Sequence, residues 1–146
     1  MKFAIVLLFL GTAVLHAEEP SEAVKKDLEL LQGSYTAESI QMGEGPGLKP
    51  EALKSFPLKI EGDSWTLGNS LRTKIKLDPT QNPKHLDMLV DIGGEKPRLI
   101  RCIYEYKDDT LTVGRAYQQV DGERPTKFEA KGIFGVAVYK KVKPEK

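Results

Sequence analysis

The side chains that could support acid–base, nucleophilic or metal chemistry are few and scattered in this sequence. His85 is the only histidine beyond residue 17, and Cys102 is the only cysteine. A zinc site takes three or four ligands from His, Cys and carboxylates, so these two residues do not suggest one. No Gly-x-Ser-x-Gly segment marks the nucleophile of a Ser–His–Asp triad. We therefore expect no catalytic residues, no metal, no cofactor and no enzymatic activity.

Paired carboxylates and clustered glycines have simpler explanations than catalysis or phosphate binding. Asp108 and Asp109 stand between two alternating segments, where they suit the turn of a hairpin. Gly43, Gly45 and Gly47 lie in a loop and not at the strand-to-helix junction that a phosphate-binding loop requires. Neither feature predicts a reaction.

One arginine stands on an apolar strand face. Arg115 alternates with Leu111 and Val113, so it points into the fold if that face is buried. A guanidinium there could bind the acidic head group of a ligand through two parallel hydrogen bonds. It could instead pair with an internal carboxylate or stack on an aromatic ring such as that of Tyr35. The sequence leaves these alternatives open.

Aromatic side chains on the predicted strands either line a pocket or fill the core. With the arginine, the candidate ligand-binding residues are Tyr35, Trp65, Tyr104, Tyr106, Arg115 and Tyr117. A charged segment near a strand end, Glu123-Arg124-Pro125-Thr126, is either a binding loop or a turn held by an arginine–carboxylate pair. Its candidate residues are Glu123 and Arg124.

The first residues indicate the compartment of the protein. Lys2 precedes the apolar run Phe3–Leu15, which suits a signal peptide but is shorter than a membrane span of about 20 residues. The chain becomes polar at Glu18, and Ala17 suits the position before a cleavage site. A buried helix would need an amphipathic pattern, which the run lacks. We therefore expect residues 1–17 to be a signal peptide and the protein to be exported, periplasmic or extracellular, with no membrane span after cleavage.

The charge and cysteine content of the mature chain argue against several classes of partner and scaffold. Without Lys2, the chain has 21 basic and 21 acidic residues, whereas nucleic acids and anionic membranes favour a basic excess. A single cysteine allows no intramolecular disulfide. Cys102 is interpreted as a buried strand residue, or alternatively as an intermolecular bridge or a reactive thiol.

Hydrophobic periodicity predicts two short helical segments, one before the first strand and one between the first and second strands. The helical segments are Glu22–Gln32, with Ser21 as N-cap and Gly33 after it, and one or two turns within Lys49–Phe56. Alternation of apolar and polar residues then predicts eight strands, Ser34–Met42, Leu58–Glu61, Ser64–Leu67, Leu71–Leu77, His85–Ile92, Arg98–Lys107, Thr110–Tyr117 and Phe134–Val142. Phe128 is a candidate start of a further short pairing segment.

The connections between these strands lack the long crossovers that parallel strands need, so the sheet should be antiparallel and largely up-and-down. Closing it into a barrel buries one face of each strand and removes the exposed edges, while a two-sheet sandwich is the alternative. We expect an all-β fold, an eight-stranded antiparallel up-and-down barrel with a short N-terminal helix, formed by residues 18–146 as a single domain.

Several segments taken together resemble a family of small secreted domains that is expanded in planctomycete bacteria. They are Leu31-Gln32-Gly33-Ser34-Tyr35, Ile60–Asp63, Leu77-Asp78-Pro79 with Pro83-Lys84, Ile103–Tyr106 with Asp108–Leu111, and Gly122–Thr126 with Phe128. That family is similar in plan to lipocalins, in which a short helix precedes a Gly-x-Trp at the first barrel strand. Here Gly33-x-Tyr35 stands in that place, with Tyr for Trp. The resemblance implies a lipocalin-like barrel, but no activity and no functional residue.

Two functions remain open at this level. The chain could be a binding module that holds a small, partly apolar or amphiphilic ligand inside the barrel, an expectation that rests on the predicted architecture. It could instead be a ligand-free interaction module of the cell envelope or the exterior, with a completely filled core. A hollow interior would favour the first, and an exposed apolar patch on the outer wall would favour the second.

Overall fold

The computed structural model describes residues 18–70, 72–91, 93–94, 96–117 and 122–145, and the expected signal peptide, residues 1–17, lies outside them. Within these ranges the chain forms two helices and eight strands. Their bounds are α1 Glu22–Leu31, β1 Gly33–Met42, α2 Pro50–Leu53, β2 Leu58–Glu61, β3 Ser64–Leu67, β4 Thr73–Asp78, β5 Lys84–Val90, β6 Arg98–Lys107, β7 Thr110–Ala116 and β8 Phe134–Lys141.

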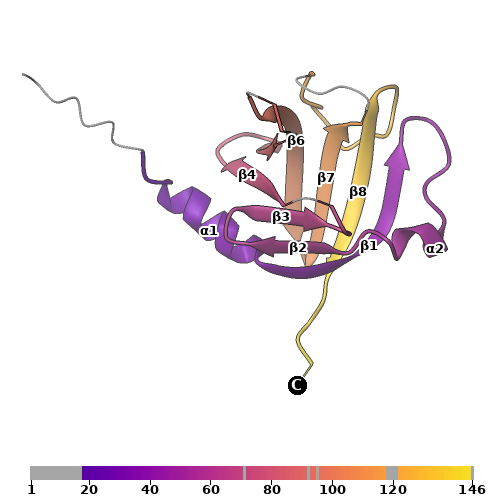
Figure 1. The fold of residues 1–146 in the computed structure, drawn as a ribbon, viewed down its shortest axis with the longest axis horizontal. Coiled ribbons are helices and arrows are strands. Elements are labelled where there is room, and N and C mark those ends of the chain that lie inside the picture. Colours follow the sequence, from indigo (N-terminus) through magenta and orange to yellow (C-terminus); the bar gives the residue numbers. More distant parts are fainter. Residues whose placement is uncertain (1–17, 71, 92, 95, 118–121, 146) are drawn as a thin grey trace, which may run out of the picture.

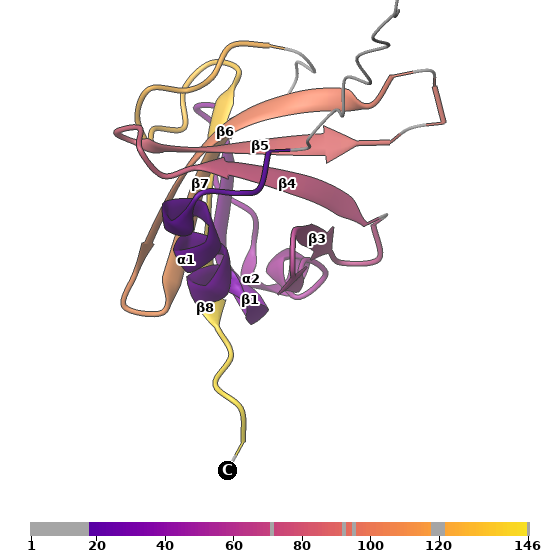
Figure 2. The same ribbon diagram turned by 90° about the vertical axis from the view of Figure 1, so that its left-hand side faces the viewer.

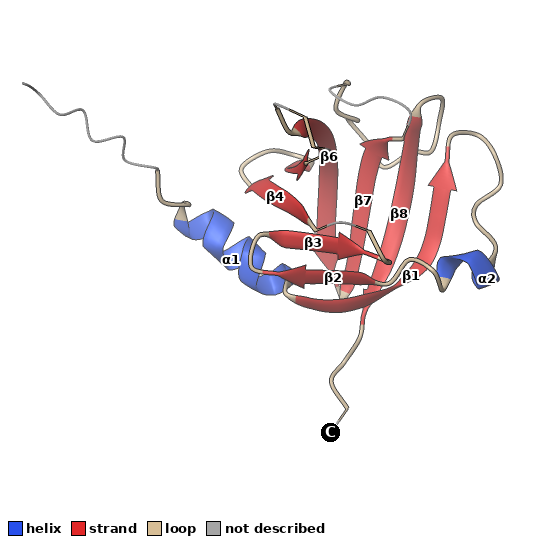
Figure 3. Ribbon diagram, in the orientation of Figure 1, coloured by secondary structure: helices blue, strands red, loops and turns tan. Residues whose placement is uncertain are grey.

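Each strand pairs antiparallel with the next strand in sequence, and β1 also pairs antiparallel with β8 (Figures 1 and 3). The sheet therefore closes on itself, which confirms the predicted all-β, up-and-down barrel and excludes the sandwich. None of the helices in the described ranges is long and apolar enough to cross a lipid bilayer.

The predicted strands agree with the observed ones to within two residues where both are described. Leu71 and Ile92, at the ends of two predicted strands, lie outside the described residues. The segment at Phe128 is different, because it forms no strand. Its ring lies over the outer wall, where a Cβ added to Gly114 would come within 3.6 Å of Phe128 Cδ1. The missing side chain at Gly114 leaves room for the ring, so Phe128 packs on the sheet and does not extend it.

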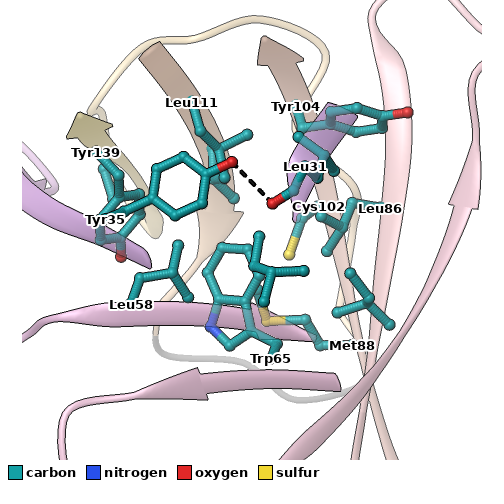
Figure 4. Close-up of a cluster of buried hydrophobic side chains, with 14 of the residues drawn as sticks. Leu31, Tyr35, Leu58, Trp65, Leu86, Met88, Cys102, Tyr104, Leu111 and Tyr139 are labelled. Carbon is teal, nitrogen blue, oxygen red and sulfur yellow. Dashed lines mark hydrogen bonds between the residues drawn. The ribbon is translucent and has the colours of Figure 1, made fainter. Parts of the chain in front are cut away.

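Alternate residues of the strands fill the inside of the barrel. Figure 4 shows the centre of this core, where the Trp65 and Tyr139 rings meet edge to face with centroids 6.0 Å apart. In β1 the pairing with β8 shifts between Ala37 and Ser39, so Glu38 is an extra, exposed residue. Such a bulge changes which residues point inward. It lets Tyr35 before it and Ile40 after it both enter the core.

We call the end of the barrel with the β2–β3, β4–β5 and β6–β7 turns the helix end, because α1 packs there (Figure 2). The opposite end, with the other strand connections, is the loop end. The β6–β7 turn consists of Asp108 and Asp109 at φ +51° and +58°, which confirms its prediction as a hairpin turn.

A buried carboxylate fixes α1 to the helix end. Asp27 is 8% exposed, and its Oδ2 accepts hydrogen bonds from Tyr104 Oη at 2.7 Å and from Lys84 Nζ at 2.6 Å. The Tyr104 hydroxyl accordingly points away from the hydrophobic cluster in Figure 4. Backbone oxygens of α1 add further bonds, since Leu31 O accepts from Tyr35 Oη at 2.8 Å and Leu30 O accepts from Lys141 Nζ at 2.9 Å. The helix end is therefore held by polar contacts that are satisfied within the chain.

Replacing Tyr104 by phenylalanine tests this anchor. Because a hydrogen bond to a charged group contributes about 1.5–3 kcal/mol, Tyr104→Phe should lower the free energy of unfolding by that amount. Tyr106→Phe is the matched control, since its hydroxyl donates at 3.2 Å to the more exposed carboxylate of Asp109. That variant should lose less than about 1 kcal/mol. Urea unfolding followed by Trp65 fluorescence measures both, and equal losses would contradict the anchoring role of Asp27.

Candidate functional site

A cavity of about 200 Å³ opens into the barrel at the loop end. Its lining is mostly apolar and, among the described residues, includes no acidic side chain. The residues around it are Ile40, Met42, Leu48, Phe56, Trp65, Leu67, Met88, Val113, Arg115, Tyr117, Ala137 and Tyr139. Of the two possibilities left open by the sequence, a hollow or a filled barrel, the structure has a hollow at the loop end, and the helix end is packed.

The connection between β1 and β2 forms part of the cavity wall. It contributes Leu48 and Phe56, and the amide of Leu48 donates to Ile40 O at 2.8 Å, which ties the connection to β1. Gly68 holds its far end, because its amide donates to Pro57 O at 2.7 Å while its φ is +59°. An L-residue rarely adopts this backbone conformation, and a Cβ there would also meet Ser55 O. The wall is therefore built from a loop that backbone contacts fix in place.

Arg115 is the charged residue of the cavity, and its charge has no counterion in the described part of the chain. Its guanidinium carbon lies 4.4 Å from the centroid of the Tyr117 ring, and Nη1 lies 4.0 Å from Met88 Sδ. Its Nε is buried without a hydrogen-bond partner, and the ion pairs among the described residues join other side chains. Of the alternatives left open by the sequence, aromatic stacking is observed, on Tyr117 and not on Tyr35.

Gly135 makes room for this stack. It lies opposite Arg115 in the β7–β8 pairing and opposite Met42 in the β1–β8 pairing. A Cβ at this position would overlap the Tyr117 ring and the carbonyl oxygen of Gln41. The Tyr117 ring therefore occupies the space that a side chain of β8 would otherwise take.

Burial governs the acid–base chemistry around the cavity. It raises the pKa of Cys102 to about 12 and raises the pKa values of Tyr117 and Tyr139, while the positive charge of Arg115 acts in the opposite direction on all three. Desolvation is the largest cause in each case, so these side chains stay neutral at physiological pH. Arg115 is thus the charged group that a molecule in the cavity would meet.

The structure separates the predicted ligand-binding residues into two groups. Trp65, Arg115 and Tyr117 line the loop-end cavity. Tyr35, Tyr104 and Tyr106 lie at the helix end, where their hydroxyls bond to Leu31, Asp27 and Asp109. Residues of the cavity that sequence reasoning missed include Tyr139 and Met88. Tyr139 could have been found from the alternation of its strand, whereas Leu48 and Phe56 follow no periodic pattern.

The charged segment that contains Glu123 and Arg124 lies on the outer wall, away from the cavity. Arg124 Nη2 lies 2.7 Å from Asp87 Oδ1, and Arg124 Nη1 donates to Cys102 O at 2.7 Å. The side chain of Glu123 is exposed. Nearby, burial and the charge of Arg124 lower the pKa of His85, partly offset by Asp78 and Asp87. The segment thus contains the arginine–carboxylate pair that was one of its two interpretations.

In the ranges that the structure describes, no three His, Cys, Asp or Glu side chains gather as a set that could hold a metal ion. Comparisons with protein-family models, with curated proteins and with solved structures gave no match for this chain. The cavity itself is therefore the basis for assigning a function.

Substitution of Gly135 tests the packing of Tyr117. Because overpacking of a core usually costs about 1–3 kcal/mol, Gly135→Ala should lower the free energy of unfolding by this amount. Tyr117→Leu in the same chain should recover part of the loss, but not all, since the Gln41 oxygen stays in place. Gly94→Ala is the control, because nothing lies within 4 Å of a Cβ there. A double-mutant cycle by urea unfolding that shows no coupling would contradict the proposed contact.

The thiol of Cys102 should be inert in the folded protein. With a pKa of about 12, only about 10⁻⁴ of it is thiolate at pH 8, and the side chain is fully buried. Iodoacetamide at pH 8 should leave the native chain unmodified and should alkylate it once in urea above the unfolding midpoint. Mass spectrometry reads the added mass, and rapid native alkylation would favour the reactive-thiol interpretation.

Proposed function

We propose that this protein is an exported, lipocalin-like binding module that holds a small, partly apolar molecule in the loop-end cavity of its barrel. The observation that carries this proposal is the cavity of about 200 Å³ with a largely apolar lining. Protein interiors are close-packed and contain few voids larger than a water molecule, so a hollow of this size in a small barrel needs a reason. Ligand binding supplies one.

The volume limits the size of the molecule. An engineered apolar cavity of about 150 Å³ accommodates benzene, while sites for drug-sized ligands measure about 300–1,000 Å³. The cavity therefore suits one ring or a short alkyl chain. Met42, which lines the cavity, is 49% exposed and places one wall at the protein surface, so a small molecule could enter past it.

The alternative function, a ligand-free interaction module, would need an apolar patch on the outer wall. Among the described residues, the large apolar side chains that are clearly exposed are Leu30, Met42 and Val142. One of these belongs to the cavity and the other two lie at the helix end. This distribution favours binding inside the barrel.

The chain contains its own reporter for a binding experiment, because Trp65 is its only tryptophan and lines the cavity. The full chain, purified from an exporting host, would be titrated with 1-octanol as a short apolar probe. We expect saturable change in Trp65 emission, since the probe replaces water beside the indole ring. Native mass spectrometry of the same protein should show a mass that leaves on denaturation if a cellular ligand is retained.

A variant with a larger side chain inside the cavity tests whether the probe binds there. Ala137 faces the cavity, so Ala137→Leu should reduce the affinity for octanol at least about tenfold by occupying ligand space. Val138→Phe adds a comparable volume on the outward face of the same strand and should leave the affinity unchanged. No saturable response in the unmodified protein, or equal responses in the two variants, would reject binding in this cavity and favour the interaction module.

A further inference from the structure

We infer that Arg115 is an anion anchor inside the cavity, and that the ligand is a small amphiphile whose oxyanion head group accepts hydrogen bonds from its guanidinium. This inference rests on the proposed function and specifies its ligand class. The apolar part of such a molecule would pack against the rings of Trp65 and Tyr139 and against Ala137 and Val113, which line the same cavity.

The first argument is charge. Arg115 is partly buried, with its Nε fully so, and an ionised group withdrawn from water is normally paired because an uncompensated charge in an apolar environment is unfavourable. The described acidic side chains that form ion pairs bind other cations, and the described residues of the cavity lining include no acidic side chain. An anion that enters the cavity would therefore meet a positive charge with little competition from the protein itself.

The second argument is the set of guanidinium N–H donors that the described part of the chain leaves without a strong acceptor. The Tyr117 ring lies against the guanidinium, and Nη1 has only a thioether sulfur, a weak acceptor, at 4.0 Å. Nε is buried and has no acceptor among the described residues. Arginine presents its N–H groups in a planar fork that matches the two oxygens of a carboxylate or the oxygens of a sulfate or phosphate. The stack on Tyr117 holds the plane of this fork before a ligand arrives.

Arg124 provides a comparison, because it is an arginine whose guanidinium has acceptors from the chain itself. Arg124 has a carboxylate at 2.7 Å and a backbone oxygen at 2.7 Å, and its side chain is 19% exposed. Arg115, on the inner face of β7, has neither a carboxylate nor a backbone oxygen as acceptor among the described residues. Its unsatisfied donors are what a ligand-binding arginine requires.

The experiment compares four probes that share one alkyl tail: octanoate, octyl sulfate, 1-octanol and octylamine. Trp65 fluorescence at neutral pH gives the dissociation constant of each. We expect octanoate or octyl sulfate to bind at least about tenfold more tightly than octanol, and octylamine to bind most weakly. The tighter of the two anions identifies whether the site prefers a planar carboxylate or a tetrahedral oxyanion.

Substitution of the arginine assigns the preference to its side chain. Arg115→Met should abolish the advantage of the anions while octanol still binds, and Arg115→Lys should retain only part of it, because lysine keeps the charge without the planar fork. Arg98→Met is the matched control, since Arg98 is exposed at the start of β6, and it should retain the full advantage. The midpoint of thermal unfolding of Arg115→Met should be unchanged or raised, because a partly buried charge without a counterion among the described residues is removed.

The outcomes separate the two proposals. Octanol binding with no tighter binding of either anion, or an anion advantage that persists in Arg115→Met, would overturn the anchor and leave the binding function standing. Failure of all four probes to change the emission of Trp65 would reject the proposed function together with the anchor. An anion advantage that disappears only in the Arg115 variants supports both.

Discussion

The pairing of β1 with β8 is the interaction on which the rest of the structure depends, because it joins the first strand of the sheet to the last. Without it the meander would have two open edges and no enclosed interior. The extra residue at Glu38 makes this pairing compatible with the core. It changes the alternation of β1 midway, so that Tyr35 at the helix end and Ile40 and Met42 at the loop end all belong to the inner face. The same pairing places Gly135 opposite Met42 and so leaves space for the Tyr117 ring.

Closure gives the barrel two ends, and the charged side chains at the two ends have different partners. At the helix end the carboxylate of Asp27 receives both a tyrosine hydroxyl and a lysine ammonium at hydrogen-bonding distance. At the loop end the guanidinium of Arg115 has an aromatic face and a thioether sulfur. Since buried polar groups in proteins are nearly always hydrogen-bonded, the contrast is consistent with a stabilising role for the helix end and with the binding role proposed for the loop end.

The fold was largely predictable from the sequence, because period-two alternation and turn residues are local signals. The β2 and β3 strands around Gly62 and the hairpin turn at Asp108-Asp109 required no information from distant residues. The site was less predictable. The alternation of Arg115 with Leu111 and Val113 indicated its inward direction, but its contact with Tyr117 depends on the absence of a side chain at Gly135 on another strand. Leu48 and Phe56 come from a connection without periodicity. The segment at Phe128 forms no strand because its ring packs over Gly114, a contact between residues distant in sequence.

Two features of the loop end oppose stability, and they occur together. A cavity forgoes packing contacts, and a partly buried arginine without a counterion among the described residues keeps part of its desolvation cost. Larger side chains at Ala137 and a neutral residue at Arg115 would remove both penalties without changing the strand pairing, and stabilising replacements of this kind are readily accessible to a sequence. Sites that break local rules of packing and polarity are expected where function requires them. A hollow and an unsatisfied cation that share one lining therefore have a common explanation in a ligand that fills the first and neutralises the second.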